Sequence, residues 1–252
     1  MEETKKKQVN FGLLGRNISY SFSRGYFAEK FKILGLEDHV YSNYDIQDIA
    51  KIDSIVNKTA GLKGLNVTIP YKEVVIPYLD KLLPSAAKIG AVNTVKVTPA
   101  GLIGYNTDAY GFQKSIEHAL TSKHKFALIL GTGGASKAVA YVLESLGIAI
   151  KFVSRTKKLH CFTYADLNKH IIEKYTVIVN CSPVGTFPNI LDKPAIPYVH
   201  ITNSHVLFDL IYNPEQTAFL AEGANRGATV LNGAKMLKLQ AEKAWEIWNE
   251  PF

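Results

Sequence analysis

KFALILGTGGASKAVAYVLESLGIAIKFVSRT (residues 125–156) is the stretch that decides the fold. It begins with an apolar run, turns through a glycine-rich segment, continues as a helix-forming segment and closes with a second apolar run that ends at Val153. This order of strand, glycine turn, helix and strand is typical of a βαβ unit, whose two strands run parallel in one sheet. The stretch therefore predicts an α/β protein that contains a Rossmann-type unit.

The turn of this unit, LILGTGGAS (128–136), has the glycine spacing of a dinucleotide-binding loop. Gly131 allows the tight turn, and Gly133 lets the backbone approach a pyrophosphate, whose charge is favoured at a helix N-terminus. The third glycine of the usual fingerprint is replaced by Ser136. The loop indicates dinucleotide binding, with a purely structural turn as the alternative. The residues expected to contact the cofactor here are Gly131, Gly133, Gly134 and Ala135.

The turn after the second strand indicates which dinucleotide is bound. An NAD enzyme usually has an acidic residue here that holds the ribose 2′-hydroxyl. This chain instead has Ser154, followed by Arg155, Lys157 and Lys158. A carboxylate would repel a 2′-phosphate, whereas an arginine can bind one through two hydrogen bonds. We therefore expect NADP, with an exposed basic turn as the alternative. The residues expected at this end of the cofactor are Ser154, Arg155, Thr156 and Lys158, although the sequence leaves open which lysine assists Arg155.

Strand and helix patterns alternate on both sides of this unit. Before it, we expect strands at 9–15, 40–46 and 64–71, helices at 24–36, 48–61, 72–80 (interrupted by Pro77) and 110–120, and a hairpin over 91–108. After it, we expect strands at 175–185, 205–212 and 228–233, and an amphipathic helix at 234–248. The N-terminal part then forms a mainly parallel sheet with helices on its faces, and a domain boundary is expected near residue 110.

Composition and charge narrow the function classes. The chain has 252 residues, which can bury the core of one large or two small domains. Its net charge of +7 includes the run Lys5–Lys7, which we interpret as a solvated tail, and no basic helix with interleaved aromatics suggests nucleic-acid binding. Cys161 and Cys181 belong to no metal-binding or disulfide pattern, which fits a reducing cytoplasm. No segment is long enough for a signal peptide or membrane span, so we expect neither export nor a membrane partner, and no metal.

Three polar residues before the glycine loop are candidates for the chemistry. Reduction of a carbonyl by a nicotinamide needs a group that protonates the developing alkoxide and hydrogen bonds that position the substrate. Lys72 closes GLNVTIPYK, Asn93 lies in GAVNT and Asp108 lies in GYNTDAYG. Because parallel strands open a crevice at their carboxyl ends, the three side chains could converge there, with Asp108 orienting Lys72. Taken singly, each is more often a solvated charge or a turn residue.

Seven motifs are spread over nearly the whole chain: GLNVTIPYK, GAVNT, GYNTDAYG, GTGGAS, SRT, DLIYNPEQTAFL and MLKLQAEKAWEIW. In these motifs and in their order, the chain resembles the shikimate dehydrogenase family. The resemblance implies reversible reduction of 3-dehydroshikimate to shikimate with NADPH, a step of chorismate and aromatic amino-acid biosynthesis. It also implies a substrate-binding, catalytic domain at 1–109, an NADP-binding Rossmann domain at 110–232, and a C-terminal helix at 233–252 that returns to the first domain.

The resemblance further implies roles for residues that match the family's motifs. Lys72 would transfer the proton at the reacting oxygen, and Asp108 would bind substrate hydroxyls and pair with Lys72 in a crevice between the domains. The other expected substrate contacts are Ser21, Ser23 and Tyr212 at the carboxylate, Thr68 and Asn93 at the ring hydroxyls, and Gln240 on the closing helix. The other expected cofactor contacts are Gly233 and Met236 at the nicotinamide, and Asn180 and Ser182 beside the dinucleotide.

The chain departs from the family's pattern around the two serines. The family usually has a proline, a histidine and a second proline where this chain has Asn17, Tyr20 and Arg24. Because both serines remain, carboxylate binding is still expected, and the shape of the loop before them is the open question. Lys235 also stands where a smaller residue is common.

Three other interpretations compete with this one. A quinate/shikimate relative that uses NAD is disfavoured by the basic turn, because such relatives often have an acid there. A non-enzymatic module that senses NADP or a metabolite would have no need for Lys72 and Asp108. A folate-type dehydrogenase shares the architecture but does not explain Ser21, Ser23 and GYNTD together. Oligomeric state is left open between a monomer and a homodimer.

Overall fold

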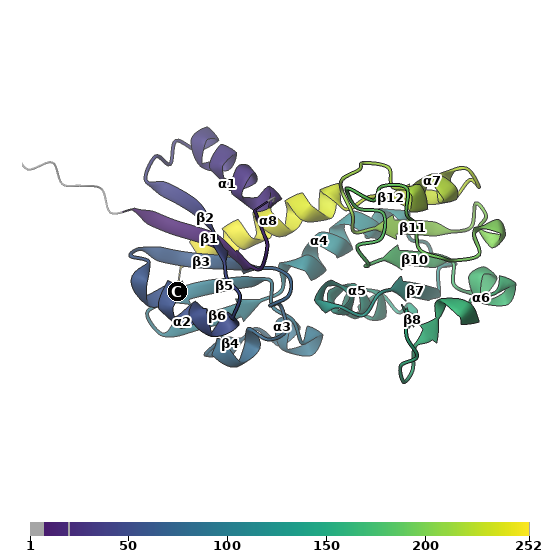
Figure 1. Ribbon diagram of the computed structural model, residues 1–252, viewed down its shortest axis with the longest axis horizontal. Coiled ribbons are helices and arrows are strands. Elements are labelled where there is room, and N and C mark those ends of the chain that lie inside the picture. The colour runs from purple at the N-terminus through teal and green to yellow at the C-terminus, as the bar shows by residue number, and fades with distance from the viewer. Residues whose placement is uncertain (1–7, 20, 252) are drawn as a thin grey trace, which may run out of the picture. The chain divides into compact units, whose positions relative to one another are not determined.

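The computed structural model describes residues 8–19 and 21–251, so Lys5–Lys7 and Tyr20 lie outside the described residues. The chain divides into two compact units (Figure 1). Unit 1 contains the residues up to Thr107 and those from Ala241 onward, and unit 2 contains Asp108–Gln240. Two helices, α4 (Thr107–Ile116) and α8 (Ala234–Asn249), contribute residues to both units.

Unit 1 is built on a six-stranded sheet with the order β2-β1-β3-β5-β6-β4. Its strands are β1 (Val9–Gly15), β2 (His39–Asp45), β3 (Leu62–Val67), β4 (Lys81–Leu82), β5 (Thr94–Thr98) and β6 (Gly101–Tyr105). Strand β1 pairs in parallel with β2 and β3, as the alternating strand and helix patterns predicted. Strand β5 runs antiparallel to β3, and it runs antiparallel to β6 because the predicted hairpin reverses the chain between them. The sheet is therefore mixed.

Helices complete unit 1. They are α1 (Phe22–Ile33), α2 (Ile52–Lys58), α3 (Pro84–Ile89) and short 3₁₀ turns at Ile49–Lys51 and Ile76–Tyr78. The helix expected over 72–80 is wrong apart from that second turn, because Pro77 lacks an N–H and cannot continue a hydrogen-bonded helix. Helix α1 packs against β1 and β2.

The carboxyl-terminal half of α8 closes the core of unit 1. Phe11 and Phe27 contact the indole ring of Trp248, and Phe11 and Phe31 contact that of Trp245. The indole N–H of Trp248 donates to the carbonyl of Val95 at 3.0 Å. Because residues on one face of α8 meet this aromatic cluster, the predicted amphipathic helix finds its apolar partner here.

Unit 2 is built on a second six-stranded sheet with the order β12-β11-β10-β7-β8-β9, and all its pairings are parallel. Its strands are β7 (Phe126–Leu130), β8 (Ala149–Ser154), β9 (Phe162–Thr163), β10 (Val177–Asn180), β11 (Val206–Asp209) and β12 (Thr229–Leu231). Its helices are α5 (Gly134–Ser145), α6 (Lys169–Lys174) and α7 (Ala218–Ala224), with 3₁₀ turns at Glu117–Ala119, Tyr164–Asp166 and Tyr198–His200. Helix α5 packs against β7 and β8, which confirms the predicted Rossmann-type βαβ unit (Figure 1).

Candidate active site

In unit 1, the carboxyl ends of β1 and β3 bring two distant motifs together. A side chain on Gly15, which ends β1, would have its Cβ 2.5 Å from Thr68 Cγ2 and 2.6 Å from Ile18 Cγ2. The backbone N–H of Thr68 donates to Leu14 O at 2.9 Å, and that of Arg16 donates to Ile69 O at 3.2 Å. Glycine at position 15 therefore lets the loop before the serines lie directly against Thr68.

The two serines lie at the N-terminus of α1. Ser21 is the N-cap, and its Oγ accepts a hydrogen bond from Ser23 N at 3.2 Å. Ser21 is partly exposed, whereas Ser23 is buried. The first N–H groups of a helix and its dipole favour an anion at this end. The position is thus chemically suited to a carboxylate, as the sequence led us to expect.

A buried hydrogen-bond network joins the segment that carries Ser21 and Ser23, called the serine segment below, to β3 and β5. The Tyr41 hydroxyl donates to Asn66 Oδ1 at 2.7 Å, and Asn66 Nδ2 donates to Asn93 O and Thr94 Oγ1, each at 3.3 Å. Burial raises the pKa of Tyr41, and a hydrogen bond from the Ser23 side chain opposes that rise. The network therefore links Ser23 to Asn93 through two residues that the sequence had not singled out.

Tyr41 and Asn66 were missed because their partners are distant in the sequence. In the sequence, Tyr41 looks like any aromatic residue of a half-buried strand. Only the structure shows that its hydroxyl donates to a residue 25 positions away. Asn66 did carry a signal, since an asparagine inside the apolar run of GLNVTIPYK requires buried hydrogen-bond partners.

Asn93 holds the junction at which α4 begins. Its Oδ1 accepts from Thr107 N at 2.7 Å, and its Nδ2 donates to Thr107 Oγ1 at 2.9 Å. Its carbonyl accepts from Val67 N at 2.8 Å, which ties β3 to the same point. Asn93 is only 3% exposed, so much of its hydrogen-bonding capacity serves the fold. Asp108, buried in the first turn of α4, follows Thr107 in the chain.

Lys72 is held by its backbone rather than by a strand. Strand β3 ends at Val67, and a turn closed by Tyr71 N and Thr68 O (2.8 Å) leads to Lys72. The carbonyl of Lys72 accepts from Val92 N at 2.7 Å, which fixes the turn beside the GAVNT motif. The side chain of Lys72 is half-buried. Its expected pairing with Asp108 stays a prediction.

In unit 2, the glycine loop between β7 and α5 has room for a phosphate group. Gly131 has φ +111°, a left-handed conformation that favours glycine. Gly133 has φ −86°, which any residue can adopt, and a Cβ there would meet no protein atom within 4 Å. Because the fold itself does not require glycine at position 133, close approach by a ligand is the remaining reason for it. Ser136, in place of the third glycine, is buried and donates to Gly133 O at 2.6 Å.

The basic turn after β8 extends beside this loop. Lys158 Nζ donates to Thr132 Oγ1 at 2.9 Å, so this lysine reaches back to the glycine loop. Arg155 is exposed, and its charge opposes the rise that burial causes in the pKa of Tyr164. Ser154 is buried, and its Oγ accepts from Thr156 N at 3.4 Å. The donor set therefore fits a 2′-phosphate, with Lys158 as the lysine that faces the loop.

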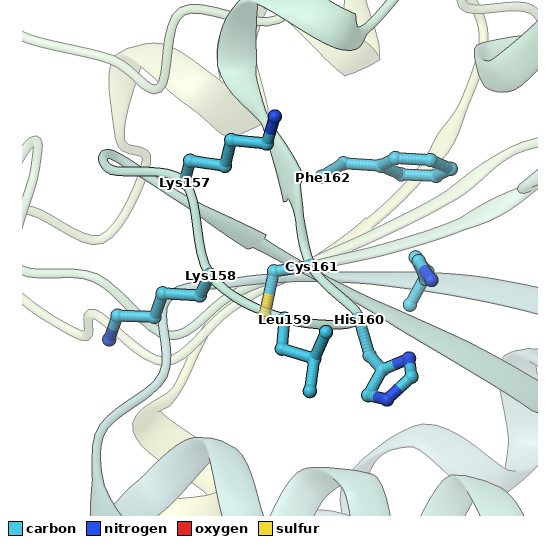
Figure 2. A pocket seen from close by; sticks show the side chains of 7 residues that line it. Lys157, Lys158, Leu159, His160, Cys161 and Phe162 are labelled. Carbon is cyan, nitrogen blue, oxygen red and sulfur yellow. The ribbon is translucent and has the colours of Figure 1, made fainter.

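The same turn borders a surface cavity of about 440 Å³. Lys157, Lys158, His160, Cys161 and Phe162 line it, together with Lys151 and Leu159. In Figure 2 the side chains of Lys157 and Lys158 point in different directions. Lys151 Nζ lies 5.3 Å from the centre of the Phe162 ring, within the range of a cation–π contact. Both cysteines are free thiols and are partly exposed.

The loop after β10 is ordered by a buried carboxylate. Asp209 accepts from Asn180 Nδ2 at 3.1 Å, from Thr217 Oγ1 at 2.7 Å and from Ile211 N at 3.1 Å. Asn180 Oδ1 in turn accepts from the backbone N–H and the hydroxyl of Ser182, at 3.1 and 2.6 Å. Burial raises the pKa of Asp209 to about 6, and its three hydrogen bonds oppose that rise. Asn180 and Ser182 are thus engaged in shaping the loop itself.

The remaining predicted residues of unit 2 have structural surroundings of their own. A side chain on Gly233 would overlap the carbonyl of Leu210, so glycine is needed there for packing. Met236 is buried, and its carbonyl would lie 2.6 Å from a Cβ on Gly111. Gln240 is buried and donates to Leu237 O at 2.9 Å, whereas Tyr212 is 38% exposed.

Neither a metal-binding cluster nor a membrane-spanning helix is found within residues 8–19 and 21–251. No group of three or more His, Cys, Asp and Glu side chains there is arranged to hold a metal ion. No helix in that part of the chain is long and apolar enough to cross a membrane.

Comparisons with known proteins match this geometry to one family. The family model of the shikimate dehydrogenase substrate binding domain matches residues 13–95. The curated shikimate dehydrogenase (NADP(+)) of Methanococcus vannielii is 35% identical, over 96% of this chain and 92% of that protein.

Solved structures agree in fold over nearly the whole chain. Shikimate dehydrogenase 1 from Peptoclostridium difficile is 40% identical with a TM-score of 0.81, and the match covers 96% of this chain and 91% of that one. Quinate dehydrogenase from Corynebacterium glutamicum, solved in complex with NAD, is 26% identical with a TM-score of 0.84, over 96% of this chain and 94% of that one.

Proposed function

The chain belongs to the shikimate dehydrogenase family, and on that premise we propose that it is an NADP-dependent oxidoreductase that interconverts 3-dehydroshikimate and shikimate. The reaction is a step of chorismate and aromatic amino-acid biosynthesis. One observation carries the proposal: the loop before the serines lies against Thr68 at the carboxyl ends of β1 and β3, and a buried network through Tyr41 and Asn66 links Ser23 to Asn93. These groups supply hydrogen bonds for a small substrate that has a carboxylate and several hydroxyls.

We assign residues 1–109, with the C-terminal helix at 233–252, to substrate binding and catalysis, and 110–232 to NADP binding. Ser21 and Ser23 bind the substrate carboxylate at the N-terminus of α1, and Tyr212 approaches the same group. Thr68, Asn93, Asp108 and Gln240 bind the ring hydroxyls. Lys72 gives a proton to the reacting oxygen during reduction and takes it back during oxidation.

The cofactor assignment rests on the fit of the glycine loop and the basic turn. NADPH, when bound, supplies the hydride for reduction. The open space at Gly133 and the N–H groups at the start of α5 suit a pyrophosphate. Arg155 and Lys158 suit the 2′-phosphate, which supports NADP over NAD. Asn180 and Ser182 order the adjoining loop, and Gly233 and Met236 border the nicotinamide.

A second candidate function is a quinate/shikimate dehydrogenase that uses NAD or NADP. The match to a quinate dehydrogenase solved with NAD favours it. The basic turn opposes it, because no carboxylate stands at Ser154 to bind the 2′-hydroxyl. We further propose a cytoplasmic protein that acts as a monomer or homodimer on small molecules, without a nucleic-acid or membrane partner.

Steady-state kinetics of the purified protein test these proposals. The absorbance of the reduced nicotinamide would be followed with shikimate and with quinate, each with NADP and with NAD. We expect rapid reduction of NADP by shikimate and much slower reduction in the other three combinations. Comparable rates with quinate or NAD would favour the broader enzyme. No reaction with any pair would reject the dehydrogenase and favour a module that only senses its ligands.

A further inference from the structure

The loop before the two serines is held by a single carboxylate at the end of β2. Asp45 Oδ1 accepts from Asn17 N at 2.9 Å, and Asp45 Oδ2 accepts from Ile18 N at 3.2 Å. Each carboxylate oxygen thus binds one of two consecutive peptide N–H groups. Hydrogen bonds to an ionised acceptor are stronger than neutral ones, so this contact can set the path of the loop.

A second contact from β2 continues from the loop to the first serine. Asn43 Nδ2 donates to Ile18 O at 3.1 Å, and the same carbonyl accepts from Ser21 N at 3.1 Å. Both peptide groups of Ile18 are therefore bound, with Asp45 on the N–H side and Asn43 and Ser21 on the carbonyl side. Because the Ile18 side chain is only 3% exposed, the residue cannot shift without disturbing the core.

The loop's conformation explains why this chain needs such an acceptor. Asn17 has φ +57°, a left-handed conformation that asparagine adopts more readily than most residues and that proline cannot adopt. The family usually has proline at this position, which has no N–H to satisfy. With asparagine here, the chain gains both an N–H and a strained turn, and the Asp45 carboxylate stabilises both.

We propose that Asp45 is a positioning residue for substrate binding: it fixes the Asn17–Ile18 turn and thereby sets Ser21 and Ser23 for the substrate carboxylate. The inference rests on the proposed function, in which those serines bind shikimate. Asp45 acts through the backbone and does not contact the substrate. A carboxylate that acted only by its charge near an anionic substrate would instead weaken binding.

Kinetics of Asp45 variants test this role. Asp45→Ala should raise KM for shikimate roughly tenfold, since loss of two charge-assisted hydrogen bonds frees the loop. The values of kcat and KM for NADP should stay within about twofold, because the reacting groups and unit 2 are untouched. Asp45→Asn, which can accept only one of the two N–H groups well, should give a smaller rise. Asp48→Ala is the matched control, because Asp48 is an exposed carboxylate three residues further on whose side chain accepts from Ala50 N.

A double-mutant cycle separates positioning through Ser21 from general damage. If Asp45 acts through Ser21, the two single substitutions Asp45→Ala and Ser21→Ala raise KM by factors that do not multiply in the double variant. Three results would each overturn the inference in a protein that does oxidise shikimate. They are KM factors of the two single variants that multiply in the double variant, an unchanged KM in Asp45→Ala, and a lower KM in Asp45→Asn. Absence of that oxidation in the wild type would instead reject the proposed function, and the inference with it.

Discussion

Gly64 shows at the scale of one residue how a motif can serve packing and the site together. A side chain at position 64 would overlap the indole ring of Trp248, whose N–H donates to Val95 O on the neighbouring strand. The glycine that opens GLNVTIPYK is therefore required by a helix almost two hundred residues later in the chain. It keeps β3, which leads toward Thr68 and Lys72, in contact with α8.

Gly64→Ala should consequently destabilise the protein by about 1–3 kcal/mol, the usual cost of overpacking a core. The free energy of unfolding can be measured from urea denaturation followed by tryptophan fluorescence. Gly25→Ala is the matched control, because a Cβ on this exposed glycine of α1 meets nothing within 4 Å. That control should be stabilising by roughly 0.5–1 kcal/mol, as expected for glycine in a helix. Equal effects from both substitutions would refute the packing role of Gly64.

At the scale of elements, we propose that the glycine loop and the basic turn bind the cofactor together. The loop between β7 and α5 presents the N–H groups of a helix, and the turn after β8 presents three cations. The bond from Lys158 Nζ to Thr132 Oγ1 joins the two, whereas Lys157 points elsewhere (Figure 2). This contact favours Lys158 over Lys157 as the lysine that assists Arg155, a choice that the sequence left open.

Arg155→Ala and Lys158→Ala should therefore each raise KM for NADP by roughly 10- to 100-fold, the value of a lost hydrogen bond between charged groups. KM for NAD should change little, because NAD has no 2′-phosphate. Lys157→Ala serves as the control, with an expected change of less than about threefold. The same absorbance assay measures all three variants. A Lys157 effect as large as that of Lys158 would contradict the assignment.

The elements that the sequence predicted correctly are those with long periodic patterns. The βαβ unit at 125–156 and the hairpin over 91–108 follow from local apolar spacing and turn residues. The two-residue strands β4 and β9 were not predicted from the sequence, because two residues show no periodicity. The helix expected at 72–80 reduced to one turn, since tertiary contacts such as Lys72 O with Val92 N replaced its helical hydrogen bonds.

The candidate site was predictable only where a motif marks it. Lys72, Thr68 and Asn93 stand in recognisable stretches, and the structure explains how Thr68 and Asn93 join the serine segment. The roles of Asp45 and Tyr41 could not be predicted from the sequence, because each residue hydrogen-bonds to a partner some 25 residues away that no local pattern reveals.

At the scale of the whole molecule, each of the two sheets has its own buried apolar clusters, and two helices, α4 and α8, supply residues to both units. Unit 2 contains a buried carboxylate, Asp209, which makes its stability depend on pH. The pKa of Asp209 is about 6 in the folded chain, against 3.8 for an unperturbed aspartate. The folded state therefore holds this proton more tightly than the unfolded state does. Stability from this group is highest at low pH and is lost as the pH rises from about 4 to 6.

Replacing Asp209 should remove this component of the pH dependence. In the wild type, the component amounts to a loss on the order of 3 kcal/mol between pH 4 and 7. Asp209→Asn lowers stability overall, because an amide cannot accept from all three donors, but its slope over that range should be flatter. Calorimetric unfolding at several pH values compares the two slopes. Parallel slopes for wild type and variant would show that Asp209 does not titrate in this range.

We propose above all that this chain oxidises shikimate with NADP and that Lys72 moves the proton. The most direct test compares kcat for shikimate in the wild type and in Lys72→Ala, with shikimate affinity measured in parallel by calorimetry. Lys63→Ala is the control, because Lys63 is an exposed lysine on β3, the strand that leads toward the Lys72 turn. We predict that Lys72→Ala lowers kcat roughly 10²- to 10⁴-fold, while affinity and the control change little. Near wild-type turnover in Lys72→Ala would show that Lys72 does not move the proton.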